Sequence, residues 1–240
     1  MRFFKRSCWL LFFATTFSLE AAPTADEVIA HLVTRDKQLV EGRKGLDYDL
    51  DVRREKLDEN DAVVETTKEH LVVTGEHRPD YNTRPGAGNP ADESKKVSRE
   101  EPFELLSMID HFTYTLEGDE EVDGVMCYKV AFTAKPNMPY KNREEKVLNA
   151  VSGHIWAAKS DYSLVKDQGS LMHPVAVGWI FATLEKMQFQ FDSMSLPNGD
   201  IGPKRVRYSY LVSIPFMSLH EQDTRSMSNY RATGTGVSSR

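Results

Sequence analysis

The spacing of apolar residues changes from helical to strand-like near the N-terminus. This change indicates a chain that forms mainly a β-sheet, with few helices. Up to Gly42, apolar residues recur on one helical face. After Gly45, they alternate with charged residues over Leu46–Arg53. A period of two is typical of a strand with one buried and one solvated face. Strand-like patterns continue from there, so we expect a mainly β (α+β) protein with antiparallel strands.

The segment before Gly42 is expected to form one amphipathic helix. Thr24 followed by Glu27 is a capping-box pattern, and the glycines at 42 and 45 mark the helix end. The apolar residues of one face are Val28, Ile29, Leu32, Val33, Leu39 and Val40. Such a face must cover another element, and a sheet is the simplest partner.

The strand patterns predict a curved antiparallel sheet. A second strand runs over residues 62–73, and an Asp-Gly turn joins Phe112–Leu116 to Met126–Phe132 as a hairpin. The later candidate strands are Val151–Ala158, Leu164–Met172, Val177–Thr183, Glu185–Ser193, Lys204–Val212 and Met217–Arg225. Residues 84–96 are typical of an exposed loop, and Arg99–Asp110 of a short internal helix. The total of roughly nine to eleven short strands predicts a strongly curved sheet or open β-barrel, covered by the two helices.

Residues 1–22 are interpreted as a cleavable secretory signal peptide. Arg2, Lys5 and Arg6 precede an uncharged apolar stretch, Cys8–Leu19, which is short for a membrane span. Small residues and a proline follow, so cleavage after Ala21 or Ala22 is expected; a retained membrane anchor is the alternative. The remainder, 23–240, is then a single domain. We expect a periplasmic location, with secretion as the alternative.

The charge argues against a nucleic-acid partner, and the cysteine count excludes an internal disulfide in the mature chain. Removing residues 1–22 takes the net charge from −6 to about −8, and no basic cluster offers a footprint for nucleic acid. The mature chain keeps only Cys127, so it forms no internal disulfide. The apolar neighbours of Cys127 predict a buried, inert thiol.

No catalytic or metal-binding motif is present in the sequence. A nucleophile elbow is missing, and the seven histidines, including His70 and His77, lack the spacing of zinc ligands. The acidic turn Asp119–Asp123 lacks the ligand pattern of a calcium loop. We therefore expect a protein without catalytic residues, metal or cofactor, and a hydrolase ranks third among the hypotheses.

Aromatic and long apolar side chains on the strands predict an apolar cavity. Phe189 with Phe191, and Tyr208 with Tyr210, share one face of their strands. A curved sheet with such a face could enclose an apolar ligand beneath the helix, and a filled core is the equally weighted alternative. The candidate cavity residues are Tyr48, Leu50, Phe112, Tyr114, Tyr128, Phe132, Trp156, Phe189, Phe191, Tyr208 and Tyr210.

The order of these segments resembles a known superfamily. A signal peptide and amphipathic helix precede the hairpin YTLEGDEEVDGVMCYKVAFTAKP, which is followed by SGHIWAAKSDYSLVKDQG with Trp156 and the turn Ser160-Asp161. This order is similar to that of the envelope proteins related to the lipoprotein carriers LolA and LolB and to the sensory domain of RseB. The resemblance implies an open antiparallel barrel with a helical lid and an apolar cavity for acyl chains. The long loop before Arg99 departs from the compact carriers.

Two functional hypotheses follow. The first is an exported carrier or sensor that holds a lipid or the acyl group of a lipoprotein in the cavity. The second is an envelope structural or interaction domain with a filled core, which binds a protein partner through its edges or loops.

Overall fold

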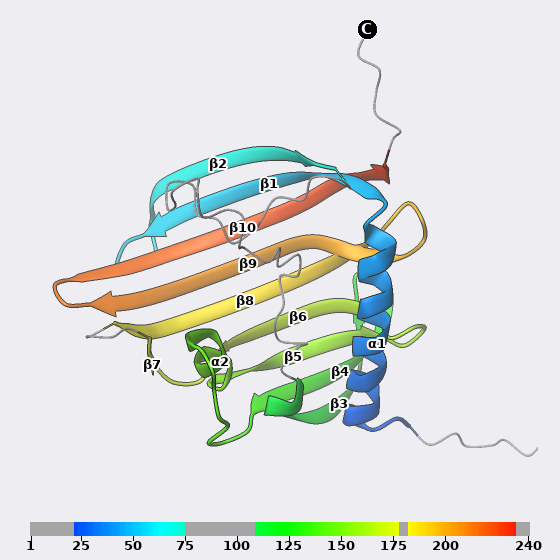
Figure 1. The fold of residues 1–240 in the computed structure, drawn as a ribbon, viewed down its shortest axis with the longest axis horizontal. Coiled ribbons are helices and arrows are strands. Elements are labelled where there is room, and N and C mark those ends of the chain that lie inside the picture. Colours follow the sequence, from blue (N-terminus) through cyan, green and yellow to red (C-terminus); the bar gives the residue numbers. More distant parts are fainter. Residues whose placement is uncertain (1–21, 75–108, 178–181, 234–240) are drawn as a thin grey trace, which may run out of the picture.

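A ten-stranded antiparallel sheet dominates the computed structural model, which describes residues 22–74, 109–177 and 182–233 (Figure 1). Its strands are β1 (Leu46–Leu57), β2 (Val63–Val73), β3 (Phe112–Val122), β4 (Val125–Ala134), β5 (Val151–Ala158), β6 (Leu164–Leu171), β7 (Val175–Ala176), β8 (Thr183–Ser195), β9 (Ile201–Ile214) and β10 (Met217–Ala232).

The strands follow the order β2-β1-β10-β9-β8-β6-β5-β4-β3, with the short β7 beside β8. Most neighbours in this order are also neighbours in the chain, while β1 pairs with the last strand. The edge strands β2 and β3 do not pair with each other in the described part, so the curved sheet stays open (Figure 1). The predicted fold class, a mainly β protein with an open curved antiparallel sheet, is confirmed.

The N-terminal helix α1 (Ala25–Arg43) begins and ends close to the predicted residues. The Thr24 side chain accepts a hydrogen bond from the amide of Glu27, whose carboxylate accepts one from the amide of Thr24 at 2.7 Å. This capping box satisfies backbone donors that an uncapped helix leaves without partners. The helix then crosses the strands at one end of the sheet (Figure 1).

The hairpin β3–β4 also matches its prediction. Asp123 and Gly124 form the turn with φ values of 50° and 82°. Two successive residues with positive φ are the requirement of the tight turn that suits twisted strands, and the Asp-Gly pair adopts them at low cost.

Several expected elements differ from the structure or lie outside it. A second helix, α2 (Arg143–Leu148), is capped by Asn142 and was not expected. Residues 1–21 of the signal peptide, the loop 84–96 and residues 99–108 of the expected internal helix lie outside the described residues. Of the expected strand Val177–Thr183, residues 178–181 lie outside the described residues; β7 ends at Ala176, and Thr183 is the first residue of β8.

The main core lies on the face of the sheet that α1 covers. Val28, Ile29 and Leu32 of α1 pack there with buried side chains from nine strands. A smaller cluster on the opposite face contains Cys127 and Trp156. No helix in the described ranges is long and apolar enough to cross a membrane.

Candidate functional site

The two faces of the sheet differ in chemistry, because side chains alternate along each strand. The face under α1 is largely apolar; Val130 pairs with Ile155, and Phe191 with Val206, along one row that crosses the strands. We call this face the helix face. The opposite face carries mainly polar side chains, and we call it the polar face.

Ten of the eleven predicted cavity residues lie on the helix face. Five are buried in its core: Leu50, Phe112, Phe132, Phe189 and Phe191. Four tyrosines are partly buried against the same cluster: Tyr48, Tyr114, Tyr128 and Tyr208. Tyr210 follows on the same face of β9, where its hydroxyl donates a hydrogen bond to Glu221. The structure therefore places these ten residues on one face of the sheet.

Trp156 lies on the polar face, apart from the other ten. It packs in the smaller cluster with Cys127 and Val165. The ammonium groups of Lys129 and Lys166 lie 5.6 and 4.8 Å from its ring centroid, a cation–π arrangement. Burial raises the pKa of the neighbouring Cys127 thiol to about 11, consistent with the inert thiol expected.

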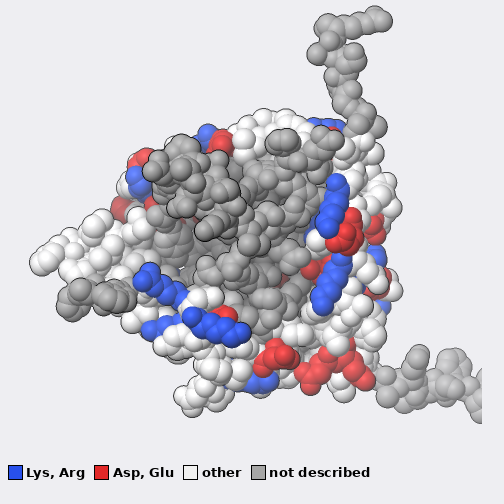
Figure 2. All heavy atoms as spheres, viewed as in Figure 1, with Lys and Arg blue, Asp and Glu red and all other residues white. Residues whose placement is uncertain are grey.

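Helix α1 is held against the sheet by apolar contacts and by one arginine. The Arg35 guanidinium lies 3.1 Å from a carboxylate oxygen of Asp161 and 3.1 Å from one of Asp200. These acids come from the β5–β6 and β8–β9 turns, so a single side chain ties the helix to two turns. Figure 2 shows basic and acidic side chains interleaved along the end of the sheet where α1 runs.

A buried carboxyl group interrupts the apolar surface of the helix face. Asp167 in β6 is 2% exposed and pairs with Ile155 and Phe191 across the strands. Its Oδ1 atom has no hydrogen-bond partner in the described part of the chain. Burial raises the pKa of Asp167 well above its usual value, since a carboxylate there would lose its hydration. The partly buried Tyr208 has its pKa raised for the same reason.

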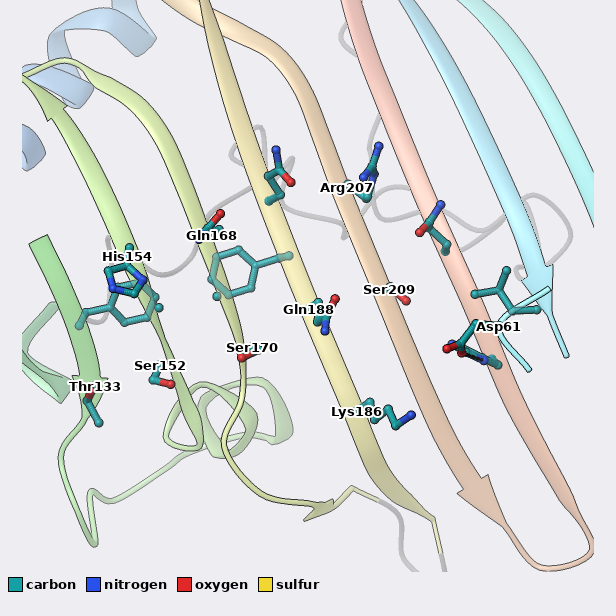
Figure 3. Close-up of a pocket in the computed structure, with 18 of the residues that line it drawn as sticks. Asp61, Thr133, Ser152, His154, Gln168, Ser170, Lys186, Gln188, Arg207 and Ser209 are labelled. Carbon is teal, nitrogen blue, oxygen red and sulfur yellow. Dashed lines mark ion pairs between the residues drawn. The ribbon is translucent and has the colours of Figure 1, made fainter. Parts of the chain in front are cut away.

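The polar face contains a groove of about 800 Å³ that was not expected from the sequence. Its lining residues come from eight strands and one turn, and most carry amides, hydroxyls, imidazoles or cations; Figure 3 shows them on adjacent strands. The labelled residues that lie on these strands are Thr133, Ser152, His154, Gln168, Ser170, Lys186, Gln188, Arg207 and Ser209. In the sequence, polar residues at alternate strand positions indicate only a solvated face, so the hollow had no separate signal.

The described residues contain no group of three or more His, Cys, Asp or Glu side chains that could hold a metal ion. The Ser163 hydroxyl donates a hydrogen bond of 2.6 Å to Asp161, whose other partner is Arg35. A serine activated for attack needs a base that takes its proton, and this serine instead supports an ion pair. It is thus a structural contact.

Comparisons with known proteins give a distant likeness. No family model and no curated protein sequence matches the chain. Among solved structures, a DUF1329 family protein from Desulfovibrio piger is 15% identical, with 90% of this chain and 96% of that chain covered and a TM-score of 0.40. A LolA superfamily protein from Nitrosomonas europaea is 11% identical, with coverages of 90% and 96% and a TM-score of 0.35.

A third solved structure, the MucA/MucB complex of Pseudomonas aeruginosa, has a chain that is 8% identical, with coverages of 88% and 99% and a TM-score of 0.27. We draw no functional argument from likenesses this distant. The resemblance to the LolA group that the sequence suggested is found again among these structures, and the chain is similar to them along nearly its whole length.

Proposed function

We propose that this chain is a binding protein of the cell envelope, located in the periplasm, that holds a lipid or the acyl group of a lipoprotein against its helix face. The observation that carries this proposal is the aromatic and aliphatic surface across the strands, which is interrupted by Asp167 and extends beyond α1. In the described part, α1 crosses one end of the strands, and Leu148 of α2 packs from another part of the molecule (Figure 1). Apolar surface of this extent gains free energy from contact with a hydrocarbon chain.

The attachment of α1 supports its role as a gate. Among the described residues, α1 forms no backbone ladder with the sheet, and Arg35 anchors it through polar contacts. The Arg35, Asp161 and Asp200 side chains are 27%, 37% and 31% exposed. Ion pairs exposed to this degree are weak, so α1 can shift without breaking the strand pairing. A shift would uncover the apolar side chains beneath it.

Burial of the aromatic rings favours a second candidate, an envelope interaction domain with a filled core. Phe132 is 1% exposed and Phe112 is 2% exposed. Rings packed this closely leave little free surface unless α1 moves. In this second function, a protein partner would bind at the strand edges or loops.

The first test is whether the purified exported chain carries an acyl ligand. Native mass spectrometry and solvent extraction should find a bound lipid, and a fluorescent fatty acid should bind to the stripped protein. Tyr208→Asp places a carboxylate on the helix face and should weaken fatty-acid binding about tenfold or more, because the charge must be desolvated beside the hydrocarbon.

Ser209→Asp is the matched control, since position 209 lies between Tyr208 and Tyr210 and faces the other side of the sheet. It should leave fatty-acid binding unchanged. Circular dichroism establishes that both variants fold. A native mass without ligand, together with no fatty-acid binding by the unmodified protein, would reject the carrier and leave the interaction domain.

A further inference from the structure

We propose that the groove on the polar face binds an anionic sugar chain. This site is separate from the helix face, since its side chains project from the opposite side of the same strands. The proposal therefore stands or fails independently of acyl binding.

A row of hydrogen-bonding side chains without protein partners crosses the floor of the groove. Thr133 pairs with Ser152, Ser152 with Ser170, Ser170 with Gln188, and Gln188 with Ser209, on five adjacent strands (Figure 3). None of these five side chains forms a hydrogen bond to another residue in the described ranges. Each can donate and accept, so the row matches a ligand that carries many hydroxyl groups.

Two cationic side chains in the groove are also available to bind a ligand. Arg207 and Lys186 both line it, and neither has an ion pair or hydrogen bond within the part of the chain that the structure describes. Their charges are a reason to expect a negatively charged group in the ligand, because a guanidinium binds carboxylate or sulfate oxygens with paired hydrogen bonds.

Asp61 also lines the groove and lies 3.5 Å from His220, and two further acids of this face have other partners. Asp192 accepts hydrogen bonds from Arg205 at 3.0 and 3.1 Å and from Gln190 at 2.9 Å. Glu55, which is 4% exposed, accepts from Gln222 at 3.0 Å and also pairs with Arg53. Arg207 and Lys186 consequently keep their attraction for an incoming anion.

The shape and chemistry of the groove favour a sugar chain over a peptide. A volume of about 800 Å³ has room for several sugar rings. The rings of Phe132 and Phe189 point to the helix face, so the groove offers few pockets for the apolar side chains that anchor peptides. An extended peptide would also bind a strand edge through its backbone, whereas this groove lies across the strands.

Isothermal titration calorimetry of the folded exported chain tests this proposal with four probes. These are a neutral glucan oligosaccharide, an oligogalacturonate, an oligosaccharide of dextran sulfate and a glutamate oligopeptide. At least one anionic sugar should bind about tenfold more tightly than the neutral glucan and the peptide, because charged hydrogen bonds add to those of the hydroxyls. The stronger of the two anionic arms identifies a carboxylate or a sulfate as the preferred group.

Arg207→Gln and Lys186→Gln should each weaken binding of that sugar about tenfold, and both should retain the fatty-acid binding of the unmodified chain. Lys37→Gln is the control, because Lys37 is an exposed cation on α1. The proposal is wrong if no anionic sugar binds, if the peptide binds more tightly, or if Lys37→Gln lowers the affinity as much as the groove variants do.

Discussion

Gly153 lies where the sheet leaves no room for a side chain. A Cβ atom placed there would be 2.0 Å from the carbonyl oxygen of Gln168 and 2.8 Å from the Phe132 ring. Because one of these neighbours is backbone, the strands would have to separate. We predict that Gly153→Ala lowers the free energy of unfolding by about 3 kcal/mol, at the upper end for overpacked sites, as measured by urea denaturation.

Gly45→Ala serves as the control for this substitution. A Cβ atom at Gly45 would meet no heavy atom within 4 Å. Its urea midpoint should stay within experimental error of that of the unmodified chain or rise slightly, since alanine has less freedom in the unfolded state. Equal midpoints for the two variants would contradict the close packing at Gly153.

Asp167 gives the protein a specific dependence on pH. Since burial raises its pKa in the folded state, the folded chain keeps a proton that the unfolded chain loses near the usual aspartate value of about 3.9. From there up to the raised pKa, the contribution of Asp167 to stability falls as pH rises. Asp167→Asn removes this penalty, so its stability relative to the unmodified chain should increase from about pH 4 to about pH 8.

Chemical denaturation at both pH values measures this change. Asp123→Asn is the control, because Asp123 is 74% exposed in the β3–β4 turn. Its stability difference from the unmodified chain should vary little between the two pH values. If Asp167→Asn were least stable relative to the unmodified chain at the higher pH, the carboxylate would have a compensating partner and our interpretation would be wrong.

At the scale of elements, the attachment of α1 depends on Arg35. Arg35→Ala removes both ion pairs and should destabilise the protein by about 1 kcal/mol, a small value because the pairs are partly solvated. Hydrogen exchange should become faster in the amides of α1 while the central strands keep their protection. Lys37→Ala, an exposed change on the same helix, should leave exchange unaltered. Uniform acceleration throughout the sheet would show that α1 does not open by itself.

Elements that are marked by a motif of a few adjacent residues were predicted more accurately than elements too short to show a periodic pattern. The Thr24 capping box and the Asp123-Gly124 turn each involve a few adjacent residues, and both were recognised correctly. Helix α2 has only six residues, so it completes too few turns to show a helical period. The two-residue β7 is too short to show alternation.

At the scale of the whole molecule, the order of the strands and the faces of some side chains depend on pairing between distant strands, which the sequence pattern does not predict. The pairing of β1 with β10 joins the two ends of the described chain, and no motif of adjacent residues predicts it. In β5, Ile155, Trp156 and Ala157 are consecutive apolar residues, so alternation did not assign Trp156 to a face. The polar groove likewise depends on which strands lie side by side and on how the sheet curves.

Export is a property of the whole chain that the N-terminal segment should control. If residues 1–22 are a signal peptide, the mature protein should appear in the periplasmic fraction with Ala22 or Pro23 as its first residue. Leu11→Arg places a charge in the apolar stretch at a cost of about 3 kcal/mol and should leave the uncleaved chain inside the cell.

Ser7→Arg adds the same charge before the apolar stretch, where basic residues belong, and should preserve export. Cell fractionation and N-terminal sequencing distinguish these outcomes. An uncleaved chain in the membrane fraction would favour the retained anchor instead. Both binding proposals would then concern a tethered protein, because the sheet and its two faces begin more than twenty residues after the apolar stretch.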